Sequence, residues 1–317
     1  MIRAFVFPGQ GSQSVGMGKE LSESYSVVRE VFEEVNDSLG QNLSQLMFEG
    51  PIEDLTLTEN AQPALMAVSL AVMRVLEKEG GMDLPNVAKF VGGHSLGEYS
   101  ALTAAGALTI SDASKLLKAR GLAMQQAVPV GVGAMAALLG MDIGPAEEVV
   151  AEAEKAAIDG GICVAANDNA DGQVVLSGHK GAVEAAIEIA KEKGAKRAML
   201  LPVSAPFHCP LMQPAADAMA EKLGDITIAP PRVPLVANVT ASQVSDPDTI
   251  RQLLVDQVTG RVRWRESVLY MGEQGVTDLV ELGTGKVLTG MVRRINRDMT
   301  GSAVQSPADI DAFLSGL

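Results

Sequence analysis

Short runs of apolar residues alternate along this chain with segments in which apolar side chains return every three or four positions. The runs are typical of strands buried on both faces, and the periodic segments are typical of helices with one buried face. Residues 24–39, for example, carry Val27, Val28, Val31 and Phe32 at helical spacing. The alternation of the two patterns predicts an α/β protein.

The pattern divides the chain into two parts. In the outer part it predicts strands and helices at residues 2–7, 24–39, 60–78, 87–91, 96–107, 111–124, 211–223, 235–239, 248–257 and 277–282. In the inner part it predicts a strand, a helix, two strands around a turn, a helix and a strand, at residues 135–141, 145–157, 162–166, 174–176, 182–193 and 198–201, with the turn at 167–172. The inner β-α-β-β-α-β order is ferredoxin-like. We therefore predict a large α/β domain of residues 1–130 and 202–317 with an inserted small subdomain of residues 131–201.

Composition narrows the classes of protein. The 317 residues are 47% hydrophobic and 20% charged, which is ordinary for a soluble globular chain. No apolar run is long enough for a membrane span, and residues 1–6 enter a strand without a signal-peptide layout, so a cytoplasmic location is expected. The net charge of −14 argues against nucleic acid and anionic membranes as partners. Cys163 and Cys209 form neither a disulfide framework nor a metal signature, and no metal or cofactor is expected.

One motif carries chemistry. Residues 93–97, GHSLG, fit the G-x-S-x-G pattern of a nucleophile elbow. Three fixed positions match easily in a chain with 32 glycines, so an ordinary turn is the alternative. The predicted strand before the motif and the predicted helix after it favour a nucleophilic Ser95. The same geometry directs the backbone N–H of Leu96 toward an oxyanion formed on an attacked carbonyl.

A nucleophilic serine needs a base, and the chain has three histidines. His94 adjoins Ser95 and points away from it in a regular elbow, and His179 is expected to be a solvated turn residue. His208, on an extended segment between prolines, is the remaining candidate. A reactive pair of His208 with Cys209 is disfavoured, because adjacent side chains on an extended segment point in opposite directions. Since the acidic residues between Ser95 and His208 lie mostly in the predicted insert, a Ser–His dyad oriented by a neutral group is favoured over a triad.

Two further features indicate a ligand. Arg120 lies among apolar neighbours on a predicted helix, and a partly buried guanidinium needs a carboxylate from the protein or from a substrate. Glycine-rich loops at residues 8–13 and 283–288 follow predicted strands, at the edge where α/β sheets bind ligands. In the first loop Gln10 offers both its backbone N–H and its side chain. A phosphate-binding loop is disfavoured there, because the G-x-x-x-x-G-K-[ST] spacing is missing.

Six motifs in order carry a resemblance that covers essentially the whole chain: PGQGSQ at 8–13, QPA at 62–64, GHSLGEY at 93–99, RG at 120–121, APFH at 205–208 and GTGKVL at 283–288. Together they resemble the malonyl-CoA:acyl carrier protein transacylases of fatty acid synthesis. The resemblance implies an α/β-hydrolase-like large domain with a ferredoxin-like insert, and a monomer is expected. It also implies malonyl-CoA and acyl carrier protein as partners, with a malonyl-serine intermediate and ping-pong kinetics.

The resemblance also assigns roles to residues. It implies Ser95 as nucleophile, His208 as base, the backbone N–H groups of Gln10 and Leu96 as the oxyanion hole, Arg120 as the group that binds the malonyl carboxylate, and the backbone carbonyl of Gln257 as the group that orients His208. The candidate basic clusters for an acidic carrier protein are Lys191, Lys193, Lys196 and Arg197, and Lys286, Arg293, Arg294 and Arg297. Ordinary solvated surface charge is the alternative for both clusters.

Two other functions remain open from the residues. A serine esterase or thioesterase would use the same dyad, but a hydrolase of neutral acyl groups has no use for a buried cation such as Arg120. A non-catalytic acyl-binding or carrier-docking module would be expected to lose Ser95 or His208, and the chain has both.

Overall fold

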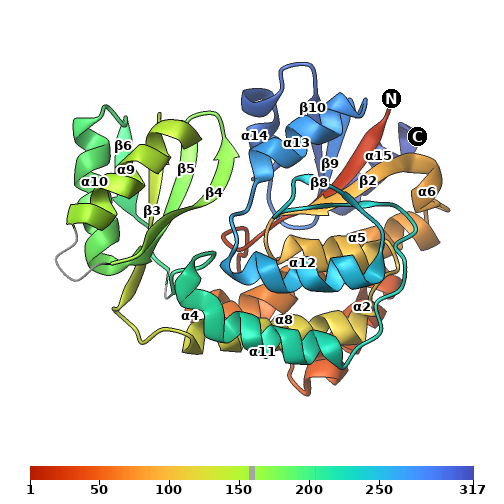
Figure 1. Cartoon of the computed structure of the whole chain (residues 1–317). Helices are drawn as coiled ribbons and strands as arrows, with labels where there is room; N and C mark the ends of the chain where they lie inside the picture. The colour runs from red at the N-terminus through yellow and green to blue at the C-terminus, as the bar shows by residue number, and fades with distance from the viewer. Residues whose placement is uncertain (157–160, 204) are drawn as a thin grey trace.

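The computed structural model describes residues 1–156, 161–203 and 205–317, and the chain in it forms two separate sheets (Figure 1). The larger sheet has the strand order β10 (Thr300–Val304), β9 (Asp278–Leu282), β1 (Arg3–Phe7), β2 (Ala88–Gly93), β7 (Leu235–Ala237) and β8 (Ser242–Val244). Its neighbours are parallel except β7 and β8. The smaller sheet is antiparallel, in the order β4 (Cys163–Ala170), β5 (Gln173–His179), β3 (Gly133–Leu139) and β6 (Arg197–Leu200).

The inner strands of the larger sheet, β9, β1, β2 and β7, are buried on both faces, as their apolar sequences predict. Successive side chains of a strand point to opposite faces. In β1, Phe5 and Phe7 accordingly pack into one core while Ala4 and Val6 pack into the other. The predicted strand at residues 2–7 is confirmed.

Helices cover both faces of this sheet. They are α1 (Lys19–Ser24), α2 (Ser26–Leu39), α3 (Leu43–Glu49), α4 (Ile52–Thr56), α5 (Thr58–Lys78), α6 (Leu84–Val87), α7 (Gly97–Ala104), α8 (Ile110–Gln126), the 3-10 helix Pro210–Met212, α11 (Gln213–Gly224), α12 (Pro247–Thr259), α13 (Trp264–Glu273), α14 (Thr289–Ile295) and α15 (Pro307–Ser315). Figure 1 places α13 and α14 across the sheet from α5, α8 and α11. No helix in the described ranges combines the length and apolar character needed to cross a bilayer.

The smaller sheet has α9 (Ile143–Ala156) and α10 (Lys180–Glu192) on one face, which gives the predicted β-α-β-β-α-β order. Its core lies between that face and the two helices. Met135 and Val175 point from the opposite face toward Val203 and Phe207, in the segment that returns to the larger sheet. The predicted end of α9 at residue 157 and residue 204 of the predicted extended segment lie outside the described residues.

The predicted turn at residues 167–172 is wrong. Strand β4 continues to Ala170, so Asp171 and Gly172 alone connect it to β5. Asparagine and aspartate favour turns because their side chains can bind nearby backbone groups. Here, however, the strand carries Asn167, Asp168 and Asn169 as buried residues.

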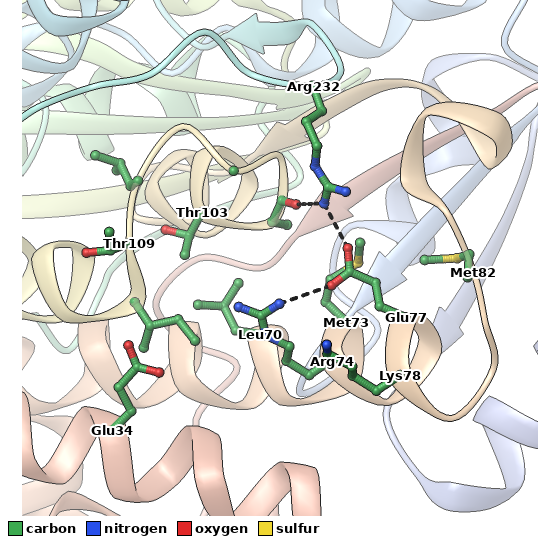
Figure 2. Close-up of a pocket in the computed structure, with 14 residues that line it drawn as sticks. Glu34, Leu70, Met73, Arg74, Glu77, Lys78, Met82, Thr103, Thr109 and Arg232 are labelled. Carbon is green, nitrogen blue, oxygen red and sulfur yellow. Dashed lines mark hydrogen bonds and ion pairs between the residues drawn. The ribbon is translucent and has the colours of Figure 1, made fainter.

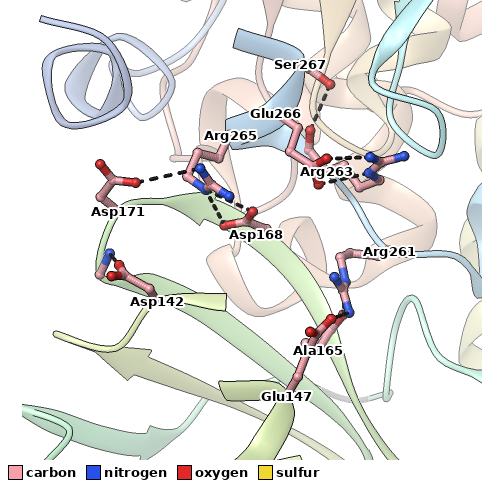
Figure 3. Close-up of polar contacts among 11 residues, drawn as sticks. Asp142, Glu147, Ala165, Asp168, Asp171, Arg261, Arg263, Arg265, Glu266 and Ser267 are labelled. Atoms are coloured by element: carbon pink, nitrogen blue, oxygen red, sulfur yellow. Dashed lines mark hydrogen bonds and ion pairs between the residues drawn. The ribbon is translucent and has the colours of Figure 1, made fainter. Parts of the chain in front are cut away.

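Polar contacts join β4 to the first turn of α13 and to the segment before it (Figure 3). Arg265 Nε lies 3.1 and 3.0 Å from the two carboxylate oxygens of Asp168. Backbone bonds run from Asp168 N to Val262 O and from Val262 N to Ala166 O, at 3.0 and 2.8 Å. Arg261 donates to the Ala165 carbonyl at 2.8 Å. The smaller sheet is therefore attached to the larger body along one side of β4.

Candidate active site

The turn between β2 and α7 has the geometry of a nucleophile elbow. Ser95 has φ 54°, a left-handed conformation that non-glycine residues adopt at a cost. A Cβ on Gly93 would lie 2.0 Å from the Gly97 carbonyl carbon, and one on Gly97 would lie 2.2 Å from the Phe7 carbonyl oxygen. The two glycines are therefore required for strand and helix to approach this closely.

Asn238, directly after β7, secures the elbow from the neighbouring strand. Its Oδ1 accepts from the backbone N–H of Ser95 at 2.8 Å, and its Nδ2 donates to the Gly93 carbonyl at 2.7 Å. Asn238 is fully buried and its amide has no contact with bulk water, so these two bonds satisfy its hydrogen-bonding groups.

His208 meets Ser95 from the segment that follows the smaller sheet. Its Nε2 lies 2.8 Å from Ser95 Oγ, and its Nδ1 lies 2.8 Å from the backbone oxygen of Gln257 in α12. Since a carbonyl can only accept, Nδ1 carries the ring proton and Nε2 is free to accept from the serine hydroxyl. Burial, and then the nearby Arg120 cation, lowers the pKa of His208 to about 3, so the imidazole is neutral near pH 7.

Arg120 in α8 is 1% exposed and reaches the same point. Its Nη1 donates to Gln62 Oε1 at 2.8 Å, and its Nη2 donates to Gln257 Oε1 at 2.8 Å and to Ser95 Oγ at 3.2 Å. The ring of Tyr99 lies 5.8 Å from the guanidinium carbon. Among the described residues no carboxylate forms an ion pair with this guanidinium, so neutral amides hold a cation whose charge remains available.

A close helix contact makes this reach possible. A Cβ on Gly121 would lie 2.5 Å from the Glu59 Cα at the start of α5. Because Gly121 lacks that atom, α8 packs directly against the first turn of α5, which carries Gln62. The RG pair thus combines the cation with the small residue that positions it.

Glu98, in the first turn of α7, is a fully buried carboxylate beside this group. Its Oε1 accepts from the backbone N–H of Asn238 at 2.8 Å, and its Oε2 accepts from Gln257 Nε2. Burial raises the pKa of Glu98 to about 7 despite these bonds.

The two residues expected to supply the oxyanion-hole N–H groups are Leu96 and Gln10. Leu96 precedes α7, and its N–H finds no acceptor among the described residues. Gln10 follows β1, and the oxygen of its side chain accepts from Thr58 Oγ1 at 2.8 Å. Both residues line the cavity described next.

A cavity of about 390 Å³ connects these groups. Ser95, His208 and Arg120 line it from the larger sheet and its helices, whereas Met135 and Asn167 line it from the smaller sheet. The site therefore lies between the two sheets, at the carboxyl ends of β1 and β2, where α/β proteins bind their ligands.

Comparison with known proteins matches this geometry. Residues 4–306 match the model of the acyl transferase domain. The chain belongs to the acyl transferase family. It is 47% identical over 311 residues to the malonyl CoA-acyl carrier protein transacylase of Escherichia coli K12, which covers 98% of each protein. It resembles the crystal structure of an acyl-carrier-protein-S-malonyltransferase from Bartonella henselae with a TM-score of 0.96 and 54% identity, over 100% of this chain and 99% of the other.

A further solved relative of this acyl transferase has a partner bound. It is a malonyl-transacylase in complex with its type II PKS acyl-carrier protein, and it is 42% identical, with a TM-score of 0.95 and 100% of both chains covered. The mixed α/β fold, with one largely parallel sheet and a separate antiparallel sheet, is thus common to the family's solved structures.

The other candidate groups of the acyl transferase have hydrogen-bond partners other than Ser95, although His94 also lines the cavity. His94 Nε2 bonds Asn169 Oδ1 at 2.8 Å, and burial lowers the pKa of its ring. Cys209 Sγ donates to the Pro206 carbonyl at 3.1 Å, and burial raises the pKa of its thiol, which disfavours a thiolate. His179 was expected to be solvated, but its Nδ1 accepts from a backbone N–H 2.9 Å away, at residue 162.

A second cavity, of about 600 Å³, lies between α5 and the segment that joins α7 to α8 (Figure 2). Its cations differ from Arg120, because Glu77 accepts from Arg232 at 2.8 Å and lies 3.4 Å from Arg74. The charges of Arg74 and Arg232 are compensated locally, and we assign this cavity no chemistry.

The sequence patterns did not predict three residues of the site: Gln62, Glu98 and Asn238. Gln62 and Glu98 stand inside the motifs QPA and GHSLGEY but had no role assigned, and for Asn238 the sequence gives no local signal. All three are buried polar side chains whose bonds to Arg120, Gln257, Gly93 and each other span 58 to 159 positions of the chain.

Proposed function

We propose that this acyl transferase moves a malonyl group from malonyl-CoA to the phosphopantetheine thiol of acyl carrier protein and so supplies the extender unit for fatty acid biosynthesis. The activity in the names of its relatives supports the substrate and the partner. The observation that carries the proposal is the placement of Arg120, 3.2 Å from Ser95 Oγ and held by neutral amides. An acyl group with a carboxylate two carbons from its thioester carbonyl could present the carbonyl to Ser95 and the carboxylate to Arg120 together.

In the first half-reaction Ser95 is the nucleophile. As Oγ bonds to the thioester carbon, its proton passes to His208 Nε2, 2.8 Å away. The carbonyl electrons move to the oxygen, which accepts from the backbone N–H groups of Leu96 and Gln10. Each donor of such an oxyanion hole contributes about 3 kcal/mol. The Gln257 carbonyl keeps the His208 ring oriented through Nδ1.

The intermediate then collapses. The carbon–sulfur bond breaks, His208 returns its proton to the departing CoA sulfur, and the malonyl group remains as an ester on Ser95. In the second half-reaction the carrier protein's thiol gives its proton to His208 and attacks that ester, and Ser95 regains its hydroxyl. One covalent intermediate shared by two half-reactions gives ping-pong kinetics.

Arg120 links substrate choice to the strength of the base. Its cation lowers the pKa of His208 in the free enzyme. A bound malonyl carboxylate offsets that charge, so the pKa rises and His208 becomes a stronger base once the matching acyl group is present. A neutral acyl group gives no such gain.

The architecture supports a division of labour. We propose that residues 1–130 and 202–317 form an α/β-hydrolase-like catalytic domain and that residues 131–201 form an inserted subdomain covering its cavity. Met135 and Asn167 in the cavity wall support this role for the insert. A monomer and a cytoplasmic location are part of the same proposal.

Intact-protein mass spectrometry after brief mixing with malonyl-CoA tests the proposal. We expect a malonyl adduct on the wild-type enzyme and none on Ser95→Ala, with CoA released in equal amount. Addition of acyl carrier protein in its phosphopantetheine form should discharge the adduct to the carrier. Rapid CoA release without an adduct would show a thioesterase, and neither adduct nor release would leave an acyl-binding module.

A further inference from the structure

One side chain separates the buried Arg120 from the nearest buried carboxylate, that of Glu98. Glu98 is buried in the same polar group, and the side-chain amide of Gln257 lies between the two. Arg120 donates to the amide oxygen at 2.8 Å, and the amide nitrogen donates to Glu98 Oε2. A direct Arg120–Glu98 pair would occupy the guanidinium. The intervening amide instead bonds to both charged groups, so the negative charge stays close while the guanidinium remains available to a substrate.

The hydrogen bonds admit one orientation of the Gln257 amide. Its nitrogen faces two acceptors, the Ser95 carbonyl at 2.9 Å and the Glu98 carboxylate. A flipped amide would face both with its oxygen and would turn its N–H₂ toward the Arg120 donors. The acceptors on one side and the donors on the other therefore set the orientation together.

Glu98 must accept at both oxygens to keep this arrangement. Asn238 N–H donates to Oε1 at 2.8 Å while Gln257 donates to Oε2. An ionised carboxylate satisfies two donors, but an amide or a protonated carboxyl has one end that donates. Glutamine at position 98 would fit sterically and still place a donor against a donor.

We propose that Glu98 is a positioning residue that, through Gln257, holds Arg120 ready for the acyl carboxylate and thereby sets the preference for malonyl over uncharged acyl groups. The inference rests on the proposed malonyl transfer. Glu98 does not line the cavity, so its effect on specificity acts through Gln257 and Arg120.

The test is Ser95 acylation of Glu98→Gln with malonyl-CoA and with acetyl-CoA, measured as kcat/KM by quenched mixing and intact-protein mass. We expect malonyl loading to fall by about 10- to 100-fold, the range for a lost charged hydrogen bond, and acetyl loading to change by less than about threefold. A residue needed for folding alone would lower both rates together. Equal losses, or no change in the malonyl-to-acetyl ratio, would overturn the proposal.

Glu281→Gln is the matched control. Glu281 is also fully buried and accepts from the backbone N–H groups of Leu288 and Thr289 at 3.2 and 2.9 Å, outside the cavity lining. It should lose stability without a change in the malonyl-to-acetyl ratio. If Glu98→Gln does not fold, the double variant Glu98→Gln, Gln257→Glu restores a donor and an acceptor between positions 98 and 257, gives up the bond to the Ser95 carbonyl, and pairs Arg120 directly with a carboxylate. It should load acetyl and lose the malonyl preference, and a retained preference would overturn the inference.

The wild-type enzyme separates the two proposals. A wild type that forms no malonyl adduct contradicts the proposed function itself. A wild type that loads malonyl, beside a Glu98→Gln variant with an unchanged ratio, contradicts the role of Glu98 alone.

Discussion

Arg120→Met removes the cation beside Ser95 and keeps an unbranched side chain in α8. In the wild-type enzyme the guanidinium lies 3.2 Å from Ser95 Oγ, close enough to bind the carboxylate of a short diacid ester. Two charged hydrogen bonds to that carboxylate would each contribute about 1.5–3 kcal/mol. Their loss removes about 3–6 kcal/mol of transition-state stabilisation and so lowers kcat/KM for malonyl loading on the order of 10²- to 10⁴-fold.

Acetyl loading should respond in the opposite direction. Burial and then Arg120 lower the pKa of His208 to about 3, so removal of the cation lets that pKa rise toward its usual value. The imidazole stays neutral at mildly alkaline pH and becomes a stronger base, so acetyl loading is expected to be equal or faster. Because His208 acts in its unprotonated form, the acid-side loss of acetyl loading should move to higher pH.

The assay is quenched mixing followed by intact-protein mass, with malonyl-CoA and acetyl-CoA, across acid to alkaline pH. Lys118→Met is the matched control, because Lys118 lies on the same helix and pairs with Glu59 at 3.4 Å, outside the cavity. It should leave the malonyl-to-acetyl ratio unchanged. If Arg120→Met lost malonyl and acetyl loading to the same extent, the assignment of Arg120 to the carboxylate would be refuted.

Three further predictions concern the surroundings of the site. Gly121→Ala places a Cβ 2.5 Å from the Glu59 Cα, so the free energy of unfolding in urea should fall by about 1–3 kcal/mol and the KM for malonyl-CoA should rise. Gly144→Ala is the control, because nothing lies within 4 Å of a Cβ there, and it should not lose stability. Equal behaviour of the two variants would contradict the packing argument. Burial raises the pKa of Glu98 to about 7, and its ionised form is the one that accepts two donors, so the malonyl-to-acetyl ratio should fall as pH falls through neutrality. The ionisable groups facing Glu98 are Arg120 and Tyr99, and a ratio independent of pH in the wild type would count against this coupling. Two basic clusters are candidates for docking acyl carrier protein: Lys191, Lys193, Lys196 and Arg197, and Lys286, Arg293, Arg294 and Arg297. Removal of the charges of the cluster that docks the carrier should raise the KM for acyl carrier protein and leave the KM for malonyl-CoA unchanged. An unchanged KM for acyl carrier protein in both cluster variants would exclude both clusters as docking sites.

Local patterns were enough to predict the elbow and most of the longer elements, whereas α3, α4, α6, β8, α13, α14, β10 and α15 were not predicted. The apolar run of β1 and the helical spacing of α2 depend on side chains a few positions apart, which a sequence displays directly. Gly93 is required by the nearby Gly97 backbone, whereas Gly97 is required by the Phe7 carbonyl of the distant strand β1, so only the motif itself, and not this contact, is local. The helix predicted at residues 24–39 is α2, which begins at Ser26, and the short α1 before it was not predicted.

Partners from distant segments could not be predicted in this way. Asn238 binds the elbow from a strand more than 140 positions away, and nothing in its own neighbourhood marks it. The turn expected at residues 167–172 failed for the same reason, since Asp168 and Asn169 bind Arg265 and His94 from far along the chain. For Ser95, His208 and Arg120 the structure brings the side chains together as expected, and their catalytic roles stay predictions.

The position of β1 in the larger sheet bears on how the enzyme comes into being. This strand, at residues 3–7, lies in the sheet between β2 and β9, and its partners in β9 begin at Asp278. During synthesis the second edge of β1 therefore stays unpaired until almost the whole chain has been made. The smaller sheet, in contrast, pairs residues within one stretch of about 70. Pairings between distant segments form slowly and leave strand edges exposed in the meantime. The segment that carries the serine is made early, but its supporting sheet is completed late, so nascent chains that stop short of β9 should be inactive and prone to aggregate.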